Sequence, residues 1–345
     1  MKLTAGMRTI PFADRFAFDF WFALQCHFST NRAIERRKNT VRARIIRRLQ
    51  ALGPRSAMPI DRVRDLSPDG FKRHYVAPGR PVVLEGAAAD WTCLRRWTFE
   101  FLREYCGNES VKITQREGVT TKERRGDKEY SHEMLFRDYM DQVLNESKTY
   151  LRFSSLLEAF PELLKDLDLA YLKRLRSSRR GAWVQTFIGA KGTRTPFHAA
   201  ITSGIFVNIS GRKRWQLIPS HYNAVLNPSP RPSEIVHTGV DAWHPDLEAY
   251  PGFDCIDRLE MVQQPGDILY FPPWMWHYVE NLDHTIGLRY GYATLRDALV
   301  GSPGLTYVRA LAAKPSLLSN ALITLTRRDI RHREDRLLAP AIIDD

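Results

Sequence analysis

The run Pro265-Gly266-Asp267-Ile268-Leu269-Tyr270-Phe271-Pro272-Pro273-Trp274-Met275-Trp276-His277 combines a turn, a strand, a rigid corner and a histidine. Pro265-Gly266 is typical of a tight turn, and the apolar and aromatic residues Ile268 to Phe271 that follow have the length of a short strand. The Pro272-Pro273 pair ends that strand, since proline cannot donate to a strand ladder. His277 then opens another strand between aromatic neighbours. The stretch therefore predicts two consecutive β-strands with an imidazole at the start of the second.

Similar runs on both sides extend this pattern to a β-rich domain. Short β-branched or aromatic segments, separated by Gly/Pro turns, occur at Pro81–Glu85, Trp183–Ile188, Ile205–Ile209, Arg214–Ile218, Leu259–Val262 and Thr285–Ala293. Several such strands in succession predict a sandwich or a barrel. Helical spacing is found in the flanking regions, from Leu157 to Leu172 and from Leu305 to Leu325.

The composition fits an ordinary globular protein in a reducing compartment. The chain has 345 residues, of which 43% are hydrophobic and 26% charged, and this length suits one large domain with appendages. No stretch reaches the roughly 18 uninterrupted apolar residues of a membrane span. The apolar region Phe12–Phe28 is broken by charges and lacks a small-residue cleavage site, which argues against a secretory signal. The four cysteines are far apart and form no CxxC pair. We therefore expect a cytoplasmic location.

The positive charge is concentrated near the N-terminus. The formal net charge is +12, and residues Asn31–Arg55 hold nine Lys or Arg and one Glu, a net +8. In this segment Ile34, Val41, Ile45 and Leu49 recur at helical spacing, which predicts a basic amphipathic helix that ends at Gly53-Pro54. Either this helix packs its apolar stripe on the main domain with its charges in solvent, or it contacts an anionic partner.

Two of the ten histidines are placed where a metal ligand is expected. His198 ends Thr195-Pro196-Phe197-His198 after a glycine-containing turn, and His277 ends the run quoted above. Two imidazoles that project into a barrel from separate strands can hold a divalent iron, and one carboxylate would complete a facial triad. Taken alone, either histidine is more often a hydrogen-bonded structural residue, and the motifs around the two favour the metal site.

From about Pro59 to Thr294 the sequence resembles the JmjC-type cupins, a family of Fe(II)- and 2-oxoglutarate-dependent oxygenases. Four motifs in the family's order carry the resemblance. They are Phe71–Val76 with Gly79–Leu84 (the entry strand), Thr195–His198 (the first metal motif), Gly211–Pro219 (the strand of the cosubstrate lysine) and Pro265–His277 (the second metal motif).

The resemblance implies a mainly β fold with helices, a double-stranded β-helix (jelly-roll) core flanked by N- and C-terminal helices. It divides the chain into a basic helical segment (1–55), a JmjC-like cupin domain (56–300) and a C-terminal helical segment (301–345). It assigns iron to His198 and His277, and the far carboxylate of 2-oxoglutarate to Lys213, with Thr195 and Tyr150 as hydroxyl partners. O2 is the further cosubstrate. The substrate is a small molecule, an amino acid or a peptide.

The sequence departs from the family at the metal motif. The family has His-x-Asp, whereas this chain reads His198-Ala199-Ala200, so Ala200 leaves one coordination position open. Two further departures are Gly204, where a polar pocket residue is common, and Arg289, where asparagine is common.

Three interpretations of Ala200 follow. The favoured one is a halogenase-type site in which chloride binds iron in the open position. The alternatives are a two-histidine hydroxylase of the JmjC type, and a JmjC-like binding protein without turnover. The segment Asn227–Phe253 is expected to border the substrate channel, with His237 and His244 as surface histidines rather than ligands.

Overall fold

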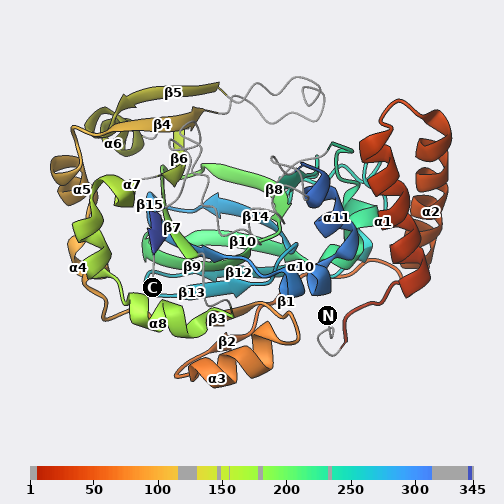
Figure 1. Ribbon diagram of the computed structural model, residues 1–345, viewed down its shortest axis with the longest axis horizontal. Helices are drawn as coiled ribbons and strands as arrows, with labels where there is room; N and C mark the ends of the chain where they lie inside the picture. Colours follow the sequence, from red (N-terminus) through yellow and green to blue (C-terminus); the bar gives the residue numbers. More distant parts are fainter. Residues whose placement is uncertain are drawn as a thin grey trace, which may run out of the picture.

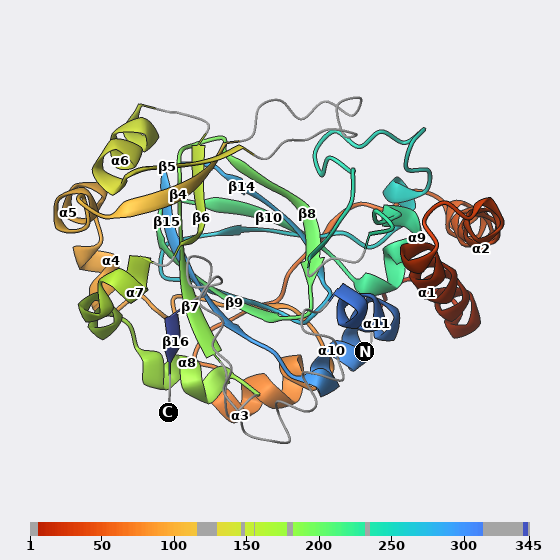
Figure 2. The same ribbon diagram turned by 45° about the horizontal axis from the view of Figure 1, so that its top comes forward.

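Two mostly antiparallel sheets form the centre of the computed structural model, which describes residues 6–115, 130–145, 149–154, 156–177, 182–231, 235–312 and 341–343 (Figure 1). From β7 to β15 the long strands alternate between the sheets, except that β10 and β12 are neighbours in the same sheet: β7, β9, β13 and β15 lie in one, and β8, β10, β12 and β14 in the other. In Figure 2 strands β8, β10 and β14 lie opposite β7 and β9. This alternation is the winding of a double-stranded β-helix, so the predicted fold class is confirmed.

The smaller sheet has the order β1 (Met58–Pro59), β12 (Leu259–Gln263), β10 (Lys213–Ile218), β14 (Trp276–Asn281), β8 (Arg194–Ala200) and β11 (Ile235–His237). The larger sheet has the order β2 (Arg62–Val63), β3 (Val82–Leu84), β13 (Ile268–Phe271), β9 (Ser203–Ser210), β15 (Thr285–Tyr292), β7 (Ala182–Gly189), β6 (Thr149–Ser154), β4 (Ser110–Gln115) and β5 (Tyr130–Leu135). Strand β16 (Ala341–Ile343) pairs with β7.

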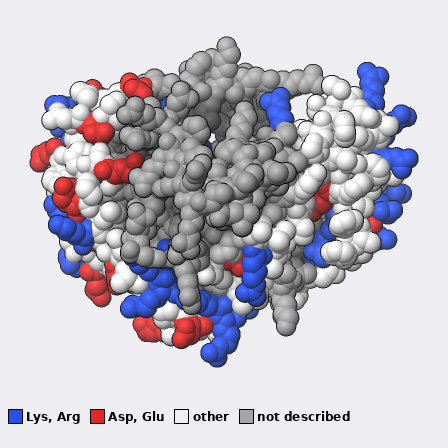
Figure 3. Space-filling model, viewed as in Figure 1, with Lys and Arg blue, Asp and Glu red and all other residues white. Residues whose placement is uncertain are grey.

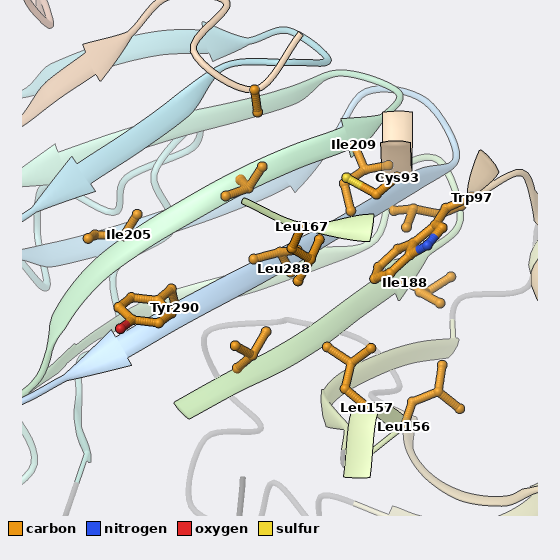
Figure 4. Close-up of a cluster of buried hydrophobic side chains, with 14 of the residues drawn as sticks. Cys93, Trp97, Leu156, Leu157, Leu167, Ile188, Ile205, Ile209, Leu288 and Tyr290 are labelled. Carbon is orange, nitrogen blue, oxygen red and sulfur yellow. The ribbon is translucent and has the colours of Figure 1, made fainter. Parts of the chain in front are cut away.

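Three apolar clusters hold the layers together. The first lies between the larger sheet and the helices outside it, where Leu156 and Leu157 approach Ile188 and Trp97 packs at one end (Figure 4). The second lies outside the smaller sheet, and the third fills the space between the sheets with side chains such as Phe206 and Trp215. Alternate residues of each strand serve different clusters because side chains in a strand point to opposite faces.

The first two helices lie at one end of the molecule, where they pack against each other and on α9 (Asn223–Leu226) and α11 (Pro303–Ala312) (Figure 2). The first two helices are α1 (Phe12–His27) and α2 (Arg32–Gln50), and their buried residues share the second cluster with β8 and β14. The predicted basic amphipathic helix is confirmed, with Val41, Ile45 and Leu49 buried. Asn31 caps it, accepting hydrogen bonds from two backbone N–H groups. Its cations gather at one end of the molecule (Figure 3).

The remaining helices are short and lie around the sheets. They are α3 (Pro68–Phe71), α4 (Thr92–Arg96), α5 (Phe99–Tyr105), α6 (Phe136–Leu144), α7 (Leu156–Ala159), α8 (Leu169–Leu175), α9 (Asn223–Leu226), α10 (Leu295–Gly301) and α11 (Pro303–Ala312), with 3₁₀ turns at Pro161–Asp166, Ser220–Tyr222 and Phe253–Cys255. Helix α11 covers the start of the helical pattern expected from Leu305, whose part beyond residue 312 lies outside the described residues. The four cysteines are buried and free.

Two expectations about local structure are wrong. The helical pattern Leu157–Leu172 is not one helix, because Pro161 lacks a backbone N–H and Asp168 caps a new helix by accepting from the N–H of Tyr171. The motif segment Phe71–Val76 is helical, with a π-helical turn over Lys72–Val76, and the entry strand is β3 alone. In both places a local helix cap or turn determines the backbone conformation, and the apolar or motif pattern of the sequence does not.

We expect Gly211→Ala to destabilise the protein more than Gly192→Ala. Both glycines have positive φ, +69° and +78°, so each alanine costs about 1–2 kcal/mol from backbone strain. A Cβ at residue 211 would also lie 2.1 Å from the carbonyl oxygen of His284, whereas at residue 192 it would meet nothing within 4 Å. Urea unfolding should show an additional loss of about 2 kcal/mol for Gly211→Ala. Equal losses would contradict the tight approach of this turn to His284.

Candidate functional site

The pairing of β8 with β14 brings the two predicted metal ligands together. His277 is the direct cross-strand partner of His198, and their ring centroids are 4.0 Å apart. The register shifts between His277 and Val279, which brings Thr195 opposite Val279. Such a bulge re-aims side chains on one strand. Both imidazoles are more than 90% buried.

Hydrogen bonds fix the orientation of both rings. The Nδ1 atom of His198 lies 2.9 Å from the carbonyl oxygen of Pro196, and that of His277 lies 3.0 Å from the carbonyl oxygen of Met275. Since a carbonyl oxygen only accepts, each Nδ1 carries the proton and each Nε2 keeps its lone pair. This is the arrangement of a metal-binding histidine whose second nitrogen is held by the protein.

Burial also keeps both imidazoles neutral. It lowers the pKa of His277 to about 3 and the pKa of His198 well below its usual range. The nearby imidazoles of His277 and His237 lower the pKa of His198 further. The neighbouring guanidinium groups of Arg289 and Arg152 act in the same direction on His277 and His198, respectively. No carboxylate among the described residues raises either pKa. The pair is therefore neutral near pH 7, as metal ligation requires.

No third protein ligand completes the pair. Within the described residues, no group of three His, Cys, Asp or Glu side chains is arranged to hold a metal ion. Ala200 ends β8 two residues after His198. On the other side, His237 of β11 is the cross-strand partner of His198, and the two rings are nearly parallel with centroids 6.0 Å apart. His237 and His244 are both exposed, as expected for surface histidines.

A buried lysine lies farther along the same barrel. Lys213 begins β10, is fully buried, and donates from Nζ to Asn281 Oδ1 and to Thr285 Oγ1, each at 2.8 Å. Asn281 is four residues after His277 on β14, about 13 Å of extended strand away. The Tyr150 hydroxyl hydrogen-bonds with Asn281 and Thr195. Hydroxyl, amide and ammonium groups thus line one side of the barrel interior.

The charge of Lys213 has no compensating carboxylate in the part of the chain that the structure describes. Its two partners are neutral oxygens, and burial lowers its pKa from 10.5 to about 7. A buried ammonium without an anion is costly, because desolvation is not offset by charge pairing. The pocket around Lys213 is therefore suited to an anionic group that enters from outside the chain.

Glycines give these side chains their room. A Cβ at Gly189 would lie 2.6 Å from the Tyr150 ring and 2.7 Å from the amide nitrogen of Asn281. At Gly287 a Cβ would lie 3.3 Å from Cε of Lys213. At Gly204, the second departure from the family pattern, a Cβ would lie 2.4 Å from the Phe271 ring, so a polar side chain has no space there without movement of Phe271.

The residues singled out in the sequence fall into two neighbouring groups. His198, His277 and Ala200 lie at the junction of β8 and β14, and Lys213, Thr195 and Tyr150 lie together farther along the barrel. Sequence reasoning missed Asn281 and Thr285. The period of two along β14 could have found Asn281, since it lies on the same face as His277. Thr285 becomes visible only through strand pairing.

Two aromatic residues fix the corner between β13 and β14. Trp274 has a φ of 62°, its backbone N–H donates to the carbonyl oxygen of Ala200 at 2.8 Å, and its indole donates to Thr306. The Trp276 indole donates to Asn223 at 2.8 Å. Both side chains are fully buried. Their indoles belong to the apolar cluster outside the smaller sheet, whereas the rings of Trp215 and Phe271 lie against His277 inside the barrel.

A winding of alternating strands around a buried histidine pair defines a cupin-like protein. A family model described as "Cupin-like domain" matches residues 68–297, or 230 of the 345 residues, and the chain belongs to this family. This family match and the JmjC names of the relatives described next confirm the resemblance to JmjC-type cupins.

Several relatives carry JmjC or demethylase names. Lysine-specific demethylase 8 of Xenopus tropicalis is 26% identical over 230 residues, which cover 65% of this chain and 50% of that protein. JmjC domain-containing protein D of Dictyostelium discoideum is 25% identical over 246 residues (63% and 52%). Arginine-specific demethylase JMJ22 of Arabidopsis thaliana is 25% identical over 256 residues (70% and 47%). The chain thus spans about half the length of these relatives.

Among the described helices, none has the length and apolar character needed to cross a membrane.

We expect Lys213→Met to stabilise the protein, and more at low pH than at high pH. The folded-state pKa of Lys213 is depressed from 10.5 to about 7, so the folded protein binds fewer protons than the unfolded protein between these values. The penalty of the buried ammonium is therefore largest below pH 7 and is relieved as the pH rises toward 10. The gain should be about 1–3 kcal/mol near pH 6 and small near pH 10, measured by urea unfolding.

Exposed Lys191 provides the matched control for this measurement. Lys191→Met should change the free energy of unfolding by less than about 0.5 kcal/mol at both pH values. A gain from Lys213→Met that did not vary with pH would show that lost charge is not its cause.

Proposed function

We propose that this protein is an Fe(II)- and 2-oxoglutarate-dependent oxygenase of the JmjC type. The observation that carries the proposal is the buried Lys213, whose ammonium donates to two neutral oxygens, lies over the rings of Tyr150 and Phe206, and shares the barrel with the histidine pair. A dicarboxylate that places one carboxylate at this lysine would remove the cost of its unpaired charge. Membership in the cupin-like family and the JmjC names of the relatives support the same assignment.

The residues present fit these groups in different degrees. The neutral Nε2 atoms of His198 and His277 suit a divalent iron, although they supply only two protein ligands. Lys213, Tyr150 and Thr195 suit the far carboxylate of 2-oxoglutarate, and we add Asn281 and Thr285 as groups that orient the lysine. When bound, iron and 2-oxoglutarate supply the oxidising power for O2-dependent C–H functionalisation.

The chain's own groups have separate tasks in this proposal. The Nδ1–H bonds of His198 and His277 fix the ring orientations before any ligand enters. Lys213, which is poised between its charged and neutral forms near pH 7, takes up a proton when a carboxylate arrives. The apolar wall of Phe206, Trp215 and Phe271 limits access of water to the interior.

The relatives favour hydroxylation-type chemistry over halogenation. Their names are those of demethylases and a JmjC-domain protein, and none of those named above is a halogenase. We therefore propose the two-histidine hydroxylase in place of the halogenase-type site favoured from Ala200, and chloride is not part of this proposal. A JmjC-like binding protein without turnover is the second outcome that the following experiments distinguish.

We expect Mn(II), used in place of iron, to bind tightly only when 2-oxoglutarate is present. Two neutral imidazoles without an anionic protein ligand hold a divalent metal weakly, and the chelating cosubstrate adds two oxygens. Calorimetry should show at least a roughly tenfold gain in Mn(II) affinity on addition of 2-oxoglutarate. His198→Ala and His277→Ala should abolish binding, while His244→Ala, at an exposed histidine, should not.

Formation of succinate from 2-oxoglutarate under O2 then separates an oxygenase from a binding protein. Tight Mn(II) binding without 2-oxoglutarate would instead mean that a further residue completes the metal site. Failure to bind Mn(II) with 2-oxoglutarate present would overturn the proposed function.

We expect Ala200→Asp to raise the affinity for Mn(II) in the absence of 2-oxoglutarate by about tenfold or more. The new carboxylate would stand two residues after His198, where the family has its aspartate, and would supply the missing anionic ligand. Ala200→Asn is the matched control, because it has nearly the same shape without the charge. Equal affinities of these two variants would show that residue 200 does not face the metal.

A further inference from the structure

Arg289 points into the barrel. It lies on β15 and is the cross-strand partner of Phe206 on β9 and of Gln185 on β7. Directly paired residues of antiparallel strands share a face of the sheet. Phe206 belongs to the cluster between the sheets, so the Arg289 side chain projects into the same interior.

The guanidinium of Arg289 is only partly satisfied. It donates from Nη2 to the hydroxyl of Thr202, while its Nε is shielded from solvent and meets no acceptor. The Oε1 atom of neighbouring Gln185 is also buried without a partner. Burial lowers the pKa of Arg289 to about 10, and no carboxylate of the described residues counters this shift. A buried hydrogen-bond donor without an acceptor costs about 1–3 kcal/mol, and more when it is charged.

Aromatic contacts connect this arginine with the metal position. Its cross-strand partner Phe206 packs edge-on against Trp215 at 5.0 Å between ring centroids, and the Trp215 ring is 6.3 Å from that of His277. The hydrogen-bond partner of Arg289, Thr202, follows Ala200 by two residues, next to the place where the family's carboxylate is absent. The charge of Arg152 also lowers the pKa of His198. Both neutral histidines thus lie within the electrostatic influence of a guanidinium.

We propose that Arg289 binds a carboxylate group beside the metal position, so that the site accepts acidic ligands and disfavours cationic ones. A carboxylate can bond the guanidinium through two parallel N–H donors, which would satisfy the Nε now lacking an acceptor. This inference rests on the proposed function and specifies its substrate class. It separates this chain from relatives whose names specify lysine or arginine, since a cationic side chain would face Arg289 at close range.

Two different molecules can supply the carboxylate that binds Arg289. The substrate can bring the carboxylate, as an acidic side chain, a C-terminal residue or a free acid. Alternatively, 2-oxoglutarate can place its near carboxylate at Arg289 while its far carboxylate is at Lys213. In both cases the open position left by Ala200 lies beside an anion that the protein itself does not supply.

The test uses the full chain loaded with Co(II) and saturating 2-oxoglutarate. Benzoate, benzamide and benzylammonium serve as probes of nearly equal shape, and paramagnetic broadening of their proton signals reports binding near the metal. We expect benzoate to bind at least about tenfold more tightly than benzamide, and benzylammonium not to bind. Arg289→Met should reduce benzoate binding by about tenfold or more, and Arg289→Lys should retain part of it.

Arg212→Met is the matched control. Arg212 carries the same charge but is exposed and paired with Asp283, so its loss should leave all three probes unchanged. Equal binding of benzoate and benzamide both with and without 2-oxoglutarate, or no effect of Arg289→Met on either benzoate or 2-oxoglutarate, would overturn the proposal. The Arg289→Lys variant keeps this conclusion independent of a folding defect in Arg289→Met.

The two sources give different results. If the substrate brings the carboxylate, benzoate adds to the 2-oxoglutarate complex, and Arg289→Met leaves 2-oxoglutarate affinity unchanged. If 2-oxoglutarate brings it, benzoate competes with 2-oxoglutarate, and Arg289→Met weakens 2-oxoglutarate by about tenfold or more. Saturation-transfer measurements of benzoate on the metal-free protein test Arg289 separately, so failure of the iron and 2-oxoglutarate assignment can be recognised as such.

Discussion

The antiparallel pairing of β8 with β14 is the constraint on which the candidate site depends. It makes His198 and His277 direct partners and, through the bulge after His277, brings Thr195 to the barrel interior. The outer faces of the same strands belong to the apolar cluster that also contains the buried residues of α1 and α2. The Pro-Pro corner before β14 is fixed by the bond from Trp274 to Ala200. A slip of one residue would turn both histidines out of the barrel.

Electrostatics gives the barrel interior its character. Lys213 and Arg289 project into it from different sheets, and neither is paired with a carboxylate of the described residues. Natural proteins rarely bury such groups without a partner, and functional sites are where they do so. Positive charge inside the barrel therefore destabilises the folded protein until an incoming anion compensates it. The two neutral imidazoles lie in the same barrel and remain available to a metal.

The sequence predicted the fold class, and it predicted that His198 and His277 project into a barrel from separate strands. Both predictions were possible because the strand periods and turn residues are local signals. The position of Lys213 followed from its motif, although its partners Asn281 and Thr285 did not, since they depend on the pairing of β10 with β14 and on β15. The orientation of Arg289 likewise needed the register of three strands. Local signals failed where a cap or proline interrupts a periodic pattern, as at Pro161 and Asp168.

The position of the first two helices has a consequence for any shortened form of this protein. The family match begins at residue 68, after both helices have ended, yet α1 and α2 belong to the same apolar cluster as Phe197 and Ala199 of β8, which they reach through α9 and α11. A fragment limited to the matched region would expose the apolar surfaces of α9 and α11 that the two helices cover. Looser packing in this cluster would weaken the support behind the strand that carries His198. Residues remote from the barrel interior can therefore tune it without touching a ligand.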